Sequence, residues 1–222
     1  MSANLDQVRQ RVLQAAKVLL IRQGYQKTTL RQIIRASGVT QGSLYQFLTS
    51  KDMVLQAVVS DLTDRVVSTV NRDFAGESPE FRYAAILAVE MAAVEHDSMI
   101  REIYCETYMK PGTFEFAVNR NTAILKRILS NSDIDAASVK PYIAALLMRV
   151  RDYITSFYVH PEGERQHNCR NLIASTLESL GLSKRQCQKV TGKLDSMQDR
   201  WRAISSSLLY GDMNDDKAPA LP

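Results

Sequence analysis

The sequence predicts an all-α protein with a small N-terminal domain and a larger C-terminal domain. Apolar residues recur at helical spacing along most of the 222 residues, and the chain holds only nine glycines and six prolines. A hydrophobic content of 45% over this length is enough for two domains, each with its own core. We therefore expect a first domain over residues 1–50, a second over 51–210, and a disordered acidic tail over 211–222.

The first domain contains two short predicted helices around a turn. Thr29 is a suitable N-cap for a helix that starts at Leu30, and Gly38 follows its last apolar residue, where a positive φ is needed. Thr40 then caps the next helix. Two short helices joined by a glycine-bearing turn are typical of a helix-turn-helix, which places its second helix in the major groove of DNA.

The second of these helices is short and polar. Leu44, together with Phe47 or Leu48, is available to pack against the domain. The remaining side chains lie on other faces, where they can reach a duplex: Gln41, Ser43, Tyr45 and Gln46. Gly42 lies inside the helix at a cost of about 1 kcal/mol relative to alanine. It indicates either a close backbone approach or a frayed first turn.

The net charge of residues 1–55 differs from that of the rest of the chain. Residues 1–55 carry eight Lys and Arg against two Asp, a net charge of +6, whereas the whole chain is +4, which leaves −2 for residues 56–222. The basic excess therefore coincides with the helix-turn-helix, where cations can displace counterions from phosphates. Taken alone, the charge fits a solvated basic surface better, and only its coincidence with the turn motif favours DNA binding.

The N-terminal residues resemble the DNA-binding domain of the tetracycline-repressor (TetR) family of bacterial transcriptional regulators. The resemblance covers about residues 8–55 and depends on five spaced elements: Arg11 to Leu20, Gly24-Tyr25, Thr28-Thr29, Gly38 to Tyr45, and Ser50-Lys51-Asp52. It implies three helices that bind DNA and a fourth that connects them to a helical domain for ligand binding and dimerisation. The rest of the chain matches the family only in length and helical character.

The resemblance also assigns DNA contacts by position. It implies that Thr28 or Thr29 and Tyr45 touch phosphates, and that Lys51, at the start of the next helix, holds another. It places Thr40, Gln41, Ser43 and Gln46 against bases or backbone, and Gly42 lies between Gln41 and Ser43 on the same helix. Phe47 departs from the family pattern, in which His or Tyr is common, and Leu48 stands where Phe is common.

Beyond residue 50 the pattern predicts successive helices. We expect them over residues 51–74, 81–94, 99–109, 114–129, 139–159 and 168–180, with the third ended by Pro111-Gly112. The second is apolar all round except for Glu90 and should be buried. We assign the last two to a dimer bundle with Phe157, Ile173 and Leu177 at the interface.

A further apolar stripe follows, which the resemblance to the TetR family does not predict. Seven residues recur at spacings of three and four: Cys187, Val190, Leu194, Met197, Trp201, Ile204 and Leu208. They predict an extra C-terminal helix. It packs either along its own subunit or across the dimer, and the sequence leaves both open.

The resemblance places a small-molecule pocket among residues 81–158. The candidate lining residues are mostly apolar or aromatic, and each could equally be plain core: Met91, Tyr104, Tyr108, Met109, Phe114, Phe116, Met148 and Tyr153. Glu90 and Arg149 are sharper candidates, because an ionisable group on an apolar helix must be paired or functional. They could bind each other or a ligand.

The motifs of other function classes are missing from the sequence. It has no Gly-rich phosphate loop after a strand, no His-Glu-x-x-His, no Cys-x-x-Cys and no Gly-x-Ser-x-Gly, so we expect no enzyme activity and no cofactor. His160, His167 and Cys169 straddle a helix break and lack a fourth metal ligand. The three cysteines suit a reducing compartment, and no stretch suits a signal peptide or membrane span, so we expect a cytoplasmic protein.

These observations predict a homodimeric regulator that binds a palindromic operator in double-stranded DNA and is released by an unknown small-molecule effector. In the TetR family such regulators are most often repressors. The alternative is a helical protein-interaction module whose DNA binding has degenerated, and an enzyme is a remote third reading. The sequence does not identify the effector or the operator.

Overall fold

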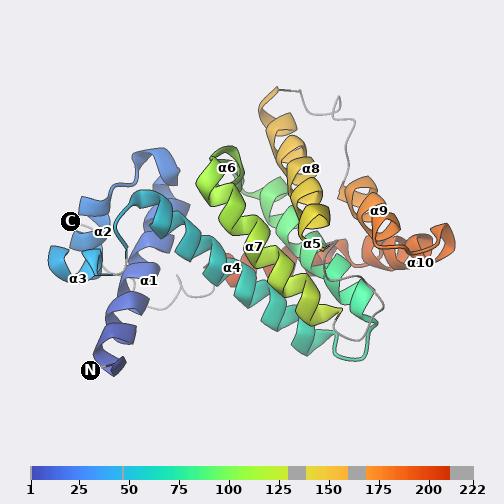
Figure 1. Ribbon diagram of the computed structural model, residues 1–222, viewed down its shortest axis with the longest axis horizontal. Coiled ribbons are helices and arrows are strands. Elements are labelled where there is room, and N and C mark those ends of the chain that lie inside the picture. Colours follow the sequence, from blue (N-terminus) through green and yellow to red (C-terminus); the bar gives the residue numbers. More distant parts are fainter. Residues whose placement is uncertain (1, 47, 130–138, 160–168, 211–222) are drawn as a thin grey trace.

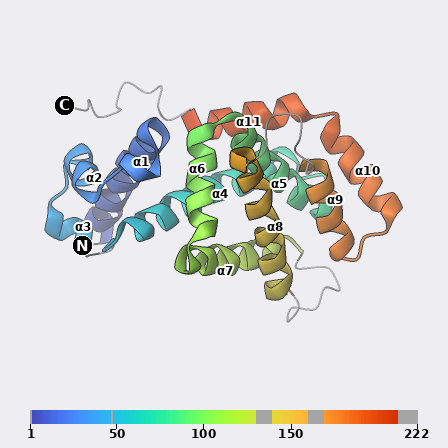
Figure 2. The same ribbon diagram turned by 90° about the horizontal axis from the view of Figure 1, so that it is seen from above.

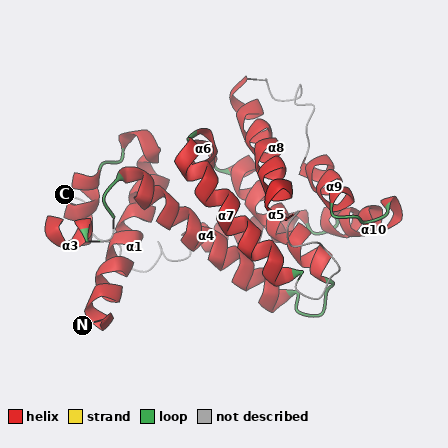
Figure 3. Ribbon diagram, in the orientation of Figure 1, coloured by secondary structure: helices red, strands yellow, loops and turns green. Residues whose placement is uncertain are grey.

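The structure is a computed structural model that describes residues 2–46, 48–129, 139–159 and 169–210. These residues form helices and no strand, which confirms the all-α prediction (Figure 3). In chain order the helices are α1 (Ser2–Lys27), α2 (Leu30–Ser37), α3 (Gln41–Tyr45), α4 (Lys51–Asp73), α5 (Pro79–His96), α6 (Ser98–Met109), α7 (Pro111–Ile128), α8 (Val139–Val159), α9 (Cys169–Ser179), α10 (Lys184–Asp195) and α11 (Gln198–Tyr210). Helices α1 to α3 form a small unit, and α4 leads from it into a larger helical body (Figure 1).

The caps expected for the helix-turn-helix are present. The Thr29 hydroxyl accepts a hydrogen bond from the Gln32 amide at 3.2 Å, and the Gln32 side chain accepts one from the Thr29 amide at 2.8 Å, which completes a capping box. Gly38 ends α2 with a φ of 62°. Thr40 caps α3 by accepting from the Ser43 amide at 3.1 Å. These local bonds fix where both helices begin and end.

Helix α5 forms the centre of the larger body. Every residue from Tyr83 to Val94 is buried, as expected for a helix that is apolar all round. It contacts α4, α6, α7, α9, α10 and α11, which surround it (Figure 2). No described helix, α5 included, is long and apolar enough to cross a membrane.

One predicted helix boundary is wrong. We expected Pro111-Gly112 to separate two helices, with the second starting at residue 114, but α7 begins at Pro111 itself. Proline suits the first turn of a helix because its fixed φ is helical and the amide it lacks would have no partner there. The prediction of a helix over residues 139–159 is confirmed by α8.

The C-terminal heptad stripe lies on two helices instead of one. The break falls at Ser196 and Met197, between α10 and α11. The Leu194 carbonyl accepts from the Met197 amide at 3.0 Å and from the Trp201 indole at 2.9 Å. These two bonds take the place of the helical hydrogen bond from the amide of residue 198. Both helices pack on α5 of their own chain, which agrees with the first of the two arrangements that the sequence left open.

Candidate nucleic-acid interface

The outer surface of α2 and α3 is polar and basic. A groove between them is lined by Leu30, Arg31, Ile34, Arg35, Gln41 and Tyr45. Tyr45 is 41% exposed although it is aromatic, and Arg31 and Arg35 are exposed and make no ion pair with another described residue. Guanidinium groups, a phenol and an amide on one surface can donate hydrogen bonds to phosphates and base edges.

The opposite faces of α2 and α3 are packed against the rest of the N-terminal unit. Ile33 of α2 and Leu44 of α3 are fully buried, and Leu48 is 6% exposed. The Arg11 side chain of α1 donates to the Ser37 carbonyl at 2.7 Å, which places a cation at the C-terminal end of α2. The predicted packing roles of Leu44 and Leu48 are therefore confirmed.

The residues predicted to contact DNA fall into two groups. The exposed or half-buried ones lie on the outer surface of the unit: Thr29, Thr40, Gln41, Gly42, Ser43, Tyr45 and Gln46. Of the two alternatives Thr28 and Thr29 for a phosphate contact, Thr28 is fully buried and its hydroxyl donates to the Gly24 carbonyl at 2.7 Å, so only Thr29 is accessible. An atom added at the Cβ position of Gly42 would meet nothing within 4 Å, so space for DNA is open there. Phe47 lies outside the described residues.

Lys51 has neighbours within the chain. Its ammonium lies 3.4 Å from the Gln26 carbonyl and 3.9 Å from the centre of the Tyr25 ring. Burial and the nearby Lys110 ammonium lower the pKa of Lys51. That it holds a phosphate stays a prediction, and such a contact would draw the ammonium away from Gln26.

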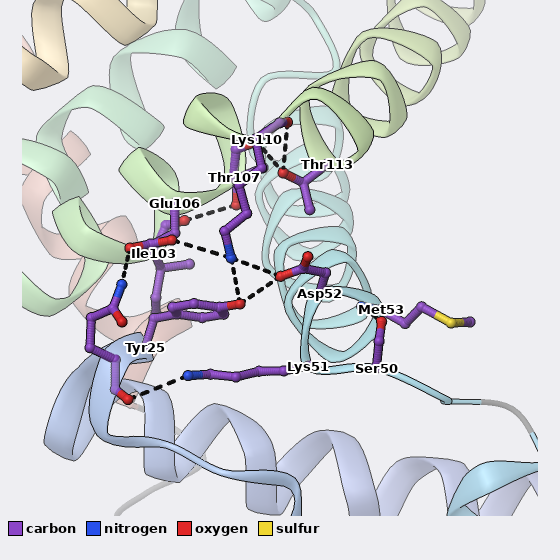
Figure 4. Close-up of polar contacts among 11 residues, drawn as sticks. Tyr25, Ser50, Lys51, Asp52, Met53, Ile103, Glu106, Thr107, Lys110 and Thr113 are labelled. Carbon is purple, nitrogen blue, oxygen red and sulfur yellow. Dashed lines mark hydrogen bonds and ion pairs between the residues drawn. The ribbon is translucent and has the colours of Figure 1, made fainter.

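A polar cluster joins the N-terminal unit to the larger body. It consists of Tyr25 and Gln26 from α1, Lys51 and Asp52 from α4, Glu102 and Glu106 from α6, and Lys110, which directly follows α6. We call these seven residues the polar junction. Figure 4 labels five of these residues: Tyr25, Lys51, Asp52, Glu106 and Lys110. The Lys110 ammonium donates to the Tyr25 hydroxyl at 2.7 Å and lies 2.8 Å from an Asp52 carboxylate oxygen. The Tyr25 hydroxyl in turn donates to the same Asp52 oxygen at 2.5 Å.

The backbone of α1 bends to reach this junction. Gly24 has a φ of 79° inside α1, a conformation that side chains rarely allow. A Cβ atom there would lie 2.2 Å from a Glu102 carboxylate oxygen. The bend lets the Gln26 amide donate to Glu102 at 3.0 Å. Glycine at position 24 therefore serves both the bend and the close approach of α6.

Electrostatics support the charged state of the junction. The hydrogen bonds from Lys110 and Tyr25 lower the pKa of Asp52. Burial disfavours the Lys110 ammonium, but its hydrogen bonds to Asp52 and Tyr25 outweigh burial and raise the pKa of Lys110. Both groups are therefore charged at neutral pH, and each stabilises the charge of the other.

Glu90 is buried as expected, but not with the predicted partner. Its carboxylate accepts from the Thr63 hydroxyl at 3.0 Å and the Tyr104 hydroxyl at 3.2 Å, and the space beside it is only about 20 Å³. The pairing with Arg149 is wrong, because that guanidinium lies on α8 and donates to the Ser175 hydroxyl at 2.8 Å. Burial raises the pKa of Glu90. Its role in ligand binding stays a prediction.

The other predicted ligand residues are divided between interior and surface. Met91, Tyr104, Tyr108 and Tyr153 are buried, and Phe114 and Phe116 are half-buried. The placement of Met148 and Met109 in an interior pocket is wrong, because they are 47% and 57% exposed. Met148 is a candidate because it is apolar, but its side chain is exposed on α8, whereas Leu147 and Val150 beside it are buried.

Two of the three predicted dimer residues cannot form an interface in this arrangement. Ile173 and Leu177 are 2% and 0% exposed in a single chain, in which α9 packs on α5, α8 and α10. Phe157 is half-buried, with the Arg101 guanidinium 4.2 Å from its ring centre. The face of α8 that a second chain could reach instead is lined by Ala145, Met148, Asp152, Thr155 and Val159. We call it the outer face of α8.

The structure contains a cavity that the sequence did not predict. It has a volume of about 430 Å³ and lies among α5, α9, α10 and α11. Its lining includes Ala88 and Ala92 of α5, Ile173 of α9, and Trp201 of α11. The only sequence signal is the pair of alanines one turn apart on a helix that is otherwise rich in larger apolar residues.

The thiols and histidines are the candidates for redox chemistry and metal binding. Burial raises the pKa of Cys169 to about 12, so this thiol is protonated at neutral pH. Among the described residues, no three His, Cys, Asp or Glu side chains are placed to hold a metal ion. His160 and His167 lie outside the described residues.

Comparisons with known proteins agree with this geometry. Residues 12–58 match the family described as bacterial regulatory proteins, tetR family. The transcriptional regulator SrpR of Pseudomonas putida is 41% identical over 59 residues, which cover 27% of this chain and only 28% of SrpR.

Two solved structures share the fold over most of the chain. RolR in complex with resorcinol has a TM-score of 0.65 at 13% identity, covering 86% of this chain and 96% of RolR. TylP, a tetR regulator from Streptomyces fradiae, has a TM-score of 0.54 at 20% identity, covering 100% of this chain and 96% of TylP. Residues 12–58 of this chain therefore match the tetR family of bacterial regulatory proteins, and the helix-turn-helix of α2 and α3 lies within the matched residues.

Proposed function

We propose that this protein is a homodimeric transcriptional repressor that binds a palindromic operator and leaves it when a small molecule binds. The observation that carries the DNA-binding part is the exposed surface of α2 and α3. Tyr45 and Gln41 lie there beside the guanidinium groups of Arg31 and Arg35, which have no ion-pair partner among the described residues. An exposed aromatic side chain and two such cations serve folding poorly, whereas a phosphate backbone would use all of them. The chromosome is cytoplasmic in bacteria, so we expect the protein there.

The dimer follows from the size of the reading helix. Helix α3 has only five residues, so one copy contacts few base pairs. Two copies related by a twofold axis would read an inverted repeat with half-sites about 34–36 Å apart or a multiple of that distance. The outer face of α8 supports this proposal because it exposes Met148 and Val159 (47% and 70%) on the body of the protein, far from α3 in the ribbon view (Figure 1).

Release would act through α4. This helix starts in the polar junction and continues along α5, so a change in the body can shift the N-terminal unit. Two recognition helices moved apart or rotated no longer fit successive major grooves. RolR, which has the same fold, is known with the ligand resorcinol, and this supports a small-molecule effector for the present chain.

The test is a gel-shift titration on the DNA upstream of the protein's own gene, at several salt concentrations. We expect a specific complex whose affinity falls steeply with salt, and competition by an inverted repeat but not by a single half-site. A protein that binds no upstream fragment better than random DNA would contradict the proposal. It would favour the alternative of a helical protein-interaction module.

A further inference from the structure

The cavity among α5, α9, α10 and α11 has the size of a ligand site. Its volume of about 430 Å³ lies within the range of pockets for small organic molecules, which is roughly 300–1,000 Å³. The space beside Glu90 is about 20 Å³, which accommodates one water molecule. Of these two spaces, only the larger can take an effector without rearrangement.

The inner wall of the cavity is apolar and fixed. Ala88 and Ala92 leave space on α5, and Ile173, Leu194 and Trp201 close the sides. The Trp201 ring is held by the Phe74 and Phe81 rings, with centroids at 5.4 and 6.5 Å, and by its hydrogen bond to the Leu194 carbonyl. A wall held in this way is preorganised to bind an apolar or aromatic body.

The charged groups at the rim differ in how well they are paired. The Glu95 carboxylate accepts from the Tyr153 hydroxyl, and Asp195 forms an ion pair with Arg170. The Arg202 guanidinium has one ion-pair partner among the described residues, Asp199, at 3.6 Å, and that side chain is fully exposed. The carboxylates of the lining are thus already bonded within the chain, whereas one guanidinium is available to a ligand.

We propose that this cavity binds a small organic acid, with its apolar or aromatic body against Ala92 and Trp201 and its carboxylate at Arg202. The Gln198 side chain also lines the cavity and can donate a second hydrogen bond. A charged hydrogen bond between guanidinium and carboxylate is among the stronger polar contacts in proteins. The inference names a ligand class for the proposed regulator, and as an effector site it rests on that proposed function. The claim that the cavity binds an organic acid does not depend on that function.

Three compounds of nearly equal shape test the charge preference: phenylbutyrate, phenylbutyramide and phenylbutylamine. Trp201 is the single tryptophan of the chain and lines the cavity, so its fluorescence reports binding at this site. We expect a saturable change with phenylbutyrate, at least tenfold weaker binding of the amide, and weaker binding still of the amine. No saturable change with the acid, or equal binding of the amine, would overturn the inference.

Two variants locate the site. Ala92→Leu fills the cavity and should abolish binding of phenylbutyrate, whereas Ala203→Leu, on the exposed side of α11, should leave it unchanged. Arg202→Gln removes the charge without adding bulk, so it remains informative if the filled variant does not fold. It should weaken phenylbutyrate at least tenfold and leave the amide unaffected, with Arg185→Gln on α10 as the control. Binding that is unchanged in both Ala92→Leu and Arg202→Gln would overturn the inference.

The operator titration separates this inference from the proposed function. A protein that binds its upstream DNA but none of the three compounds overturns the acid site alone. A protein that binds phenylbutyrate in the cavity but no operator overturns the proposed function alone.

Discussion

The N-terminal unit and the C-terminal helices both dock beside α4, but with opposite chemistry. The N-terminal unit is joined through the polar junction, where charged groups such as Lys110 and Asp52 are partly exposed, with side-chain exposures of 36% and 47%. The C-terminal helices are joined through buried aromatic rings, chiefly Trp201 against Phe74 and Phe81. The first contact adds to the shared apolar core a set of partly exposed hydrogen bonds that water can replace, whereas the second is centred on buried apolar area that water cannot replace.

This difference indicates which contact can move. Breaking a partly exposed ion pair costs about 0–1 kcal/mol, whereas removing a buried aromatic side chain costs about 3–5 kcal/mol. The C-terminal helices should therefore behave as a fixed part of the body, and the N-terminal unit as a part that can be repositioned. A regulator needs this arrangement if a ligand in the body is to change the spacing of two recognition helices.

Trp201→Ala should have the largest effect on stability. The variant loses the indole hydrogen bond to the Leu194 carbonyl and leaves a void beside Phe74 and Phe81. We expect a loss of about 3–5 kcal/mol in the free energy of unfolding. Urea unfolding followed by circular dichroism measures it, with Ser206→Ala on the exposed side of α11 as the control. A loss below about 1 kcal/mol would mean that the C-terminal helices are loosely attached.

Met148→Lys tests whether the body holds the two subunits together. The new ammonium can pair with Asp152 one turn away, so the single chain should remain folded, while charge on the outer face of α8 should separate the subunits. Sedimentation should show a monomer, and operator affinity should fall about a hundredfold because the two half-sites are no longer linked. Met109→Lys, at a similarly exposed methionine on α6, serves as the control. An unchanged dimer would place the interface elsewhere.

Lys110→Gln should loosen the polar junction with little loss of global stability. We expect the free energy of unfolding to change by less than about 1 kcal/mol. Amide hydrogen exchange near Gln26 should become several-fold faster, because the junction opens locally. Lys126→Gln on α7 is the control. A large drop in melting temperature would show that the junction is a structural core contact, and the comparison with Trp201 would fail.

The junction should also respond to acid. The pKa of Asp52 is lowered in the folded protein, so its contribution to stability is present above its ordinary pKa and is lost as the pH falls through the lowered value. Hydrogen exchange near Gln26 should therefore accelerate only in acid below about pH 4. Asp52→Asn should abolish this pH dependence, and a dependence that persists in that variant would belong to another group.

Glu90→Gln should have a small effect of the opposite sign, a gain in stability. The amide oxygen of glutamine can still accept from Thr63 and Tyr104, and no buried charge remains. Because burial raises the pKa of Glu90, the wild type loses stability as the pH rises from the ordinary value of 4.5 to the raised one, and the variant does not. The variant should be more stable by about 1 kcal/mol at neutral pH and no more stable in acid. Thermal melts at several pH values measure this, and a variant less stable at neutral pH would contradict it.

The N-terminal unit could be predicted from sequence because its signals are local. Thr29, Gly38 and Thr40 act on amides and backbone angles within four residues of themselves, and the structure confirms all three. Thr28 could not be separated from Thr29, because its burial depends on a bend at Gly24, whose carbonyl accepts from its hydroxyl, and no local signal predicts this bend. Caps can be predicted residue by residue, whereas the side of a turn on which a hydroxyl lies cannot.

The larger body was predicted as helices but not as contacts. Periodicity indicates that Ile173 and Leu177 are buried, yet it does not say whether their own chain or a partner covers them. The burial of Glu90 could be inferred from its apolar neighbours, but Thr63 and Tyr104 come from other helices and had no signal at its position. The cavity is harder still, since Ala88 and Ala92 predict tight helix packing as readily as empty space.

The most direct test of the proposed function is the salt dependence of operator binding by wild type, Arg31→Ala and Tyr45→Ala. If the surface of α2 and α3 binds DNA, Arg31→Ala should weaken binding and reduce the slope of log affinity against log salt by about one. Tyr45→Ala should weaken binding about tenfold and leave the slope nearly unchanged, because a phenol carries no charge. Both variants should keep the melting temperature of the wild type. Wild-type affinity and slope in both variants would contradict the assignment of this surface to DNA.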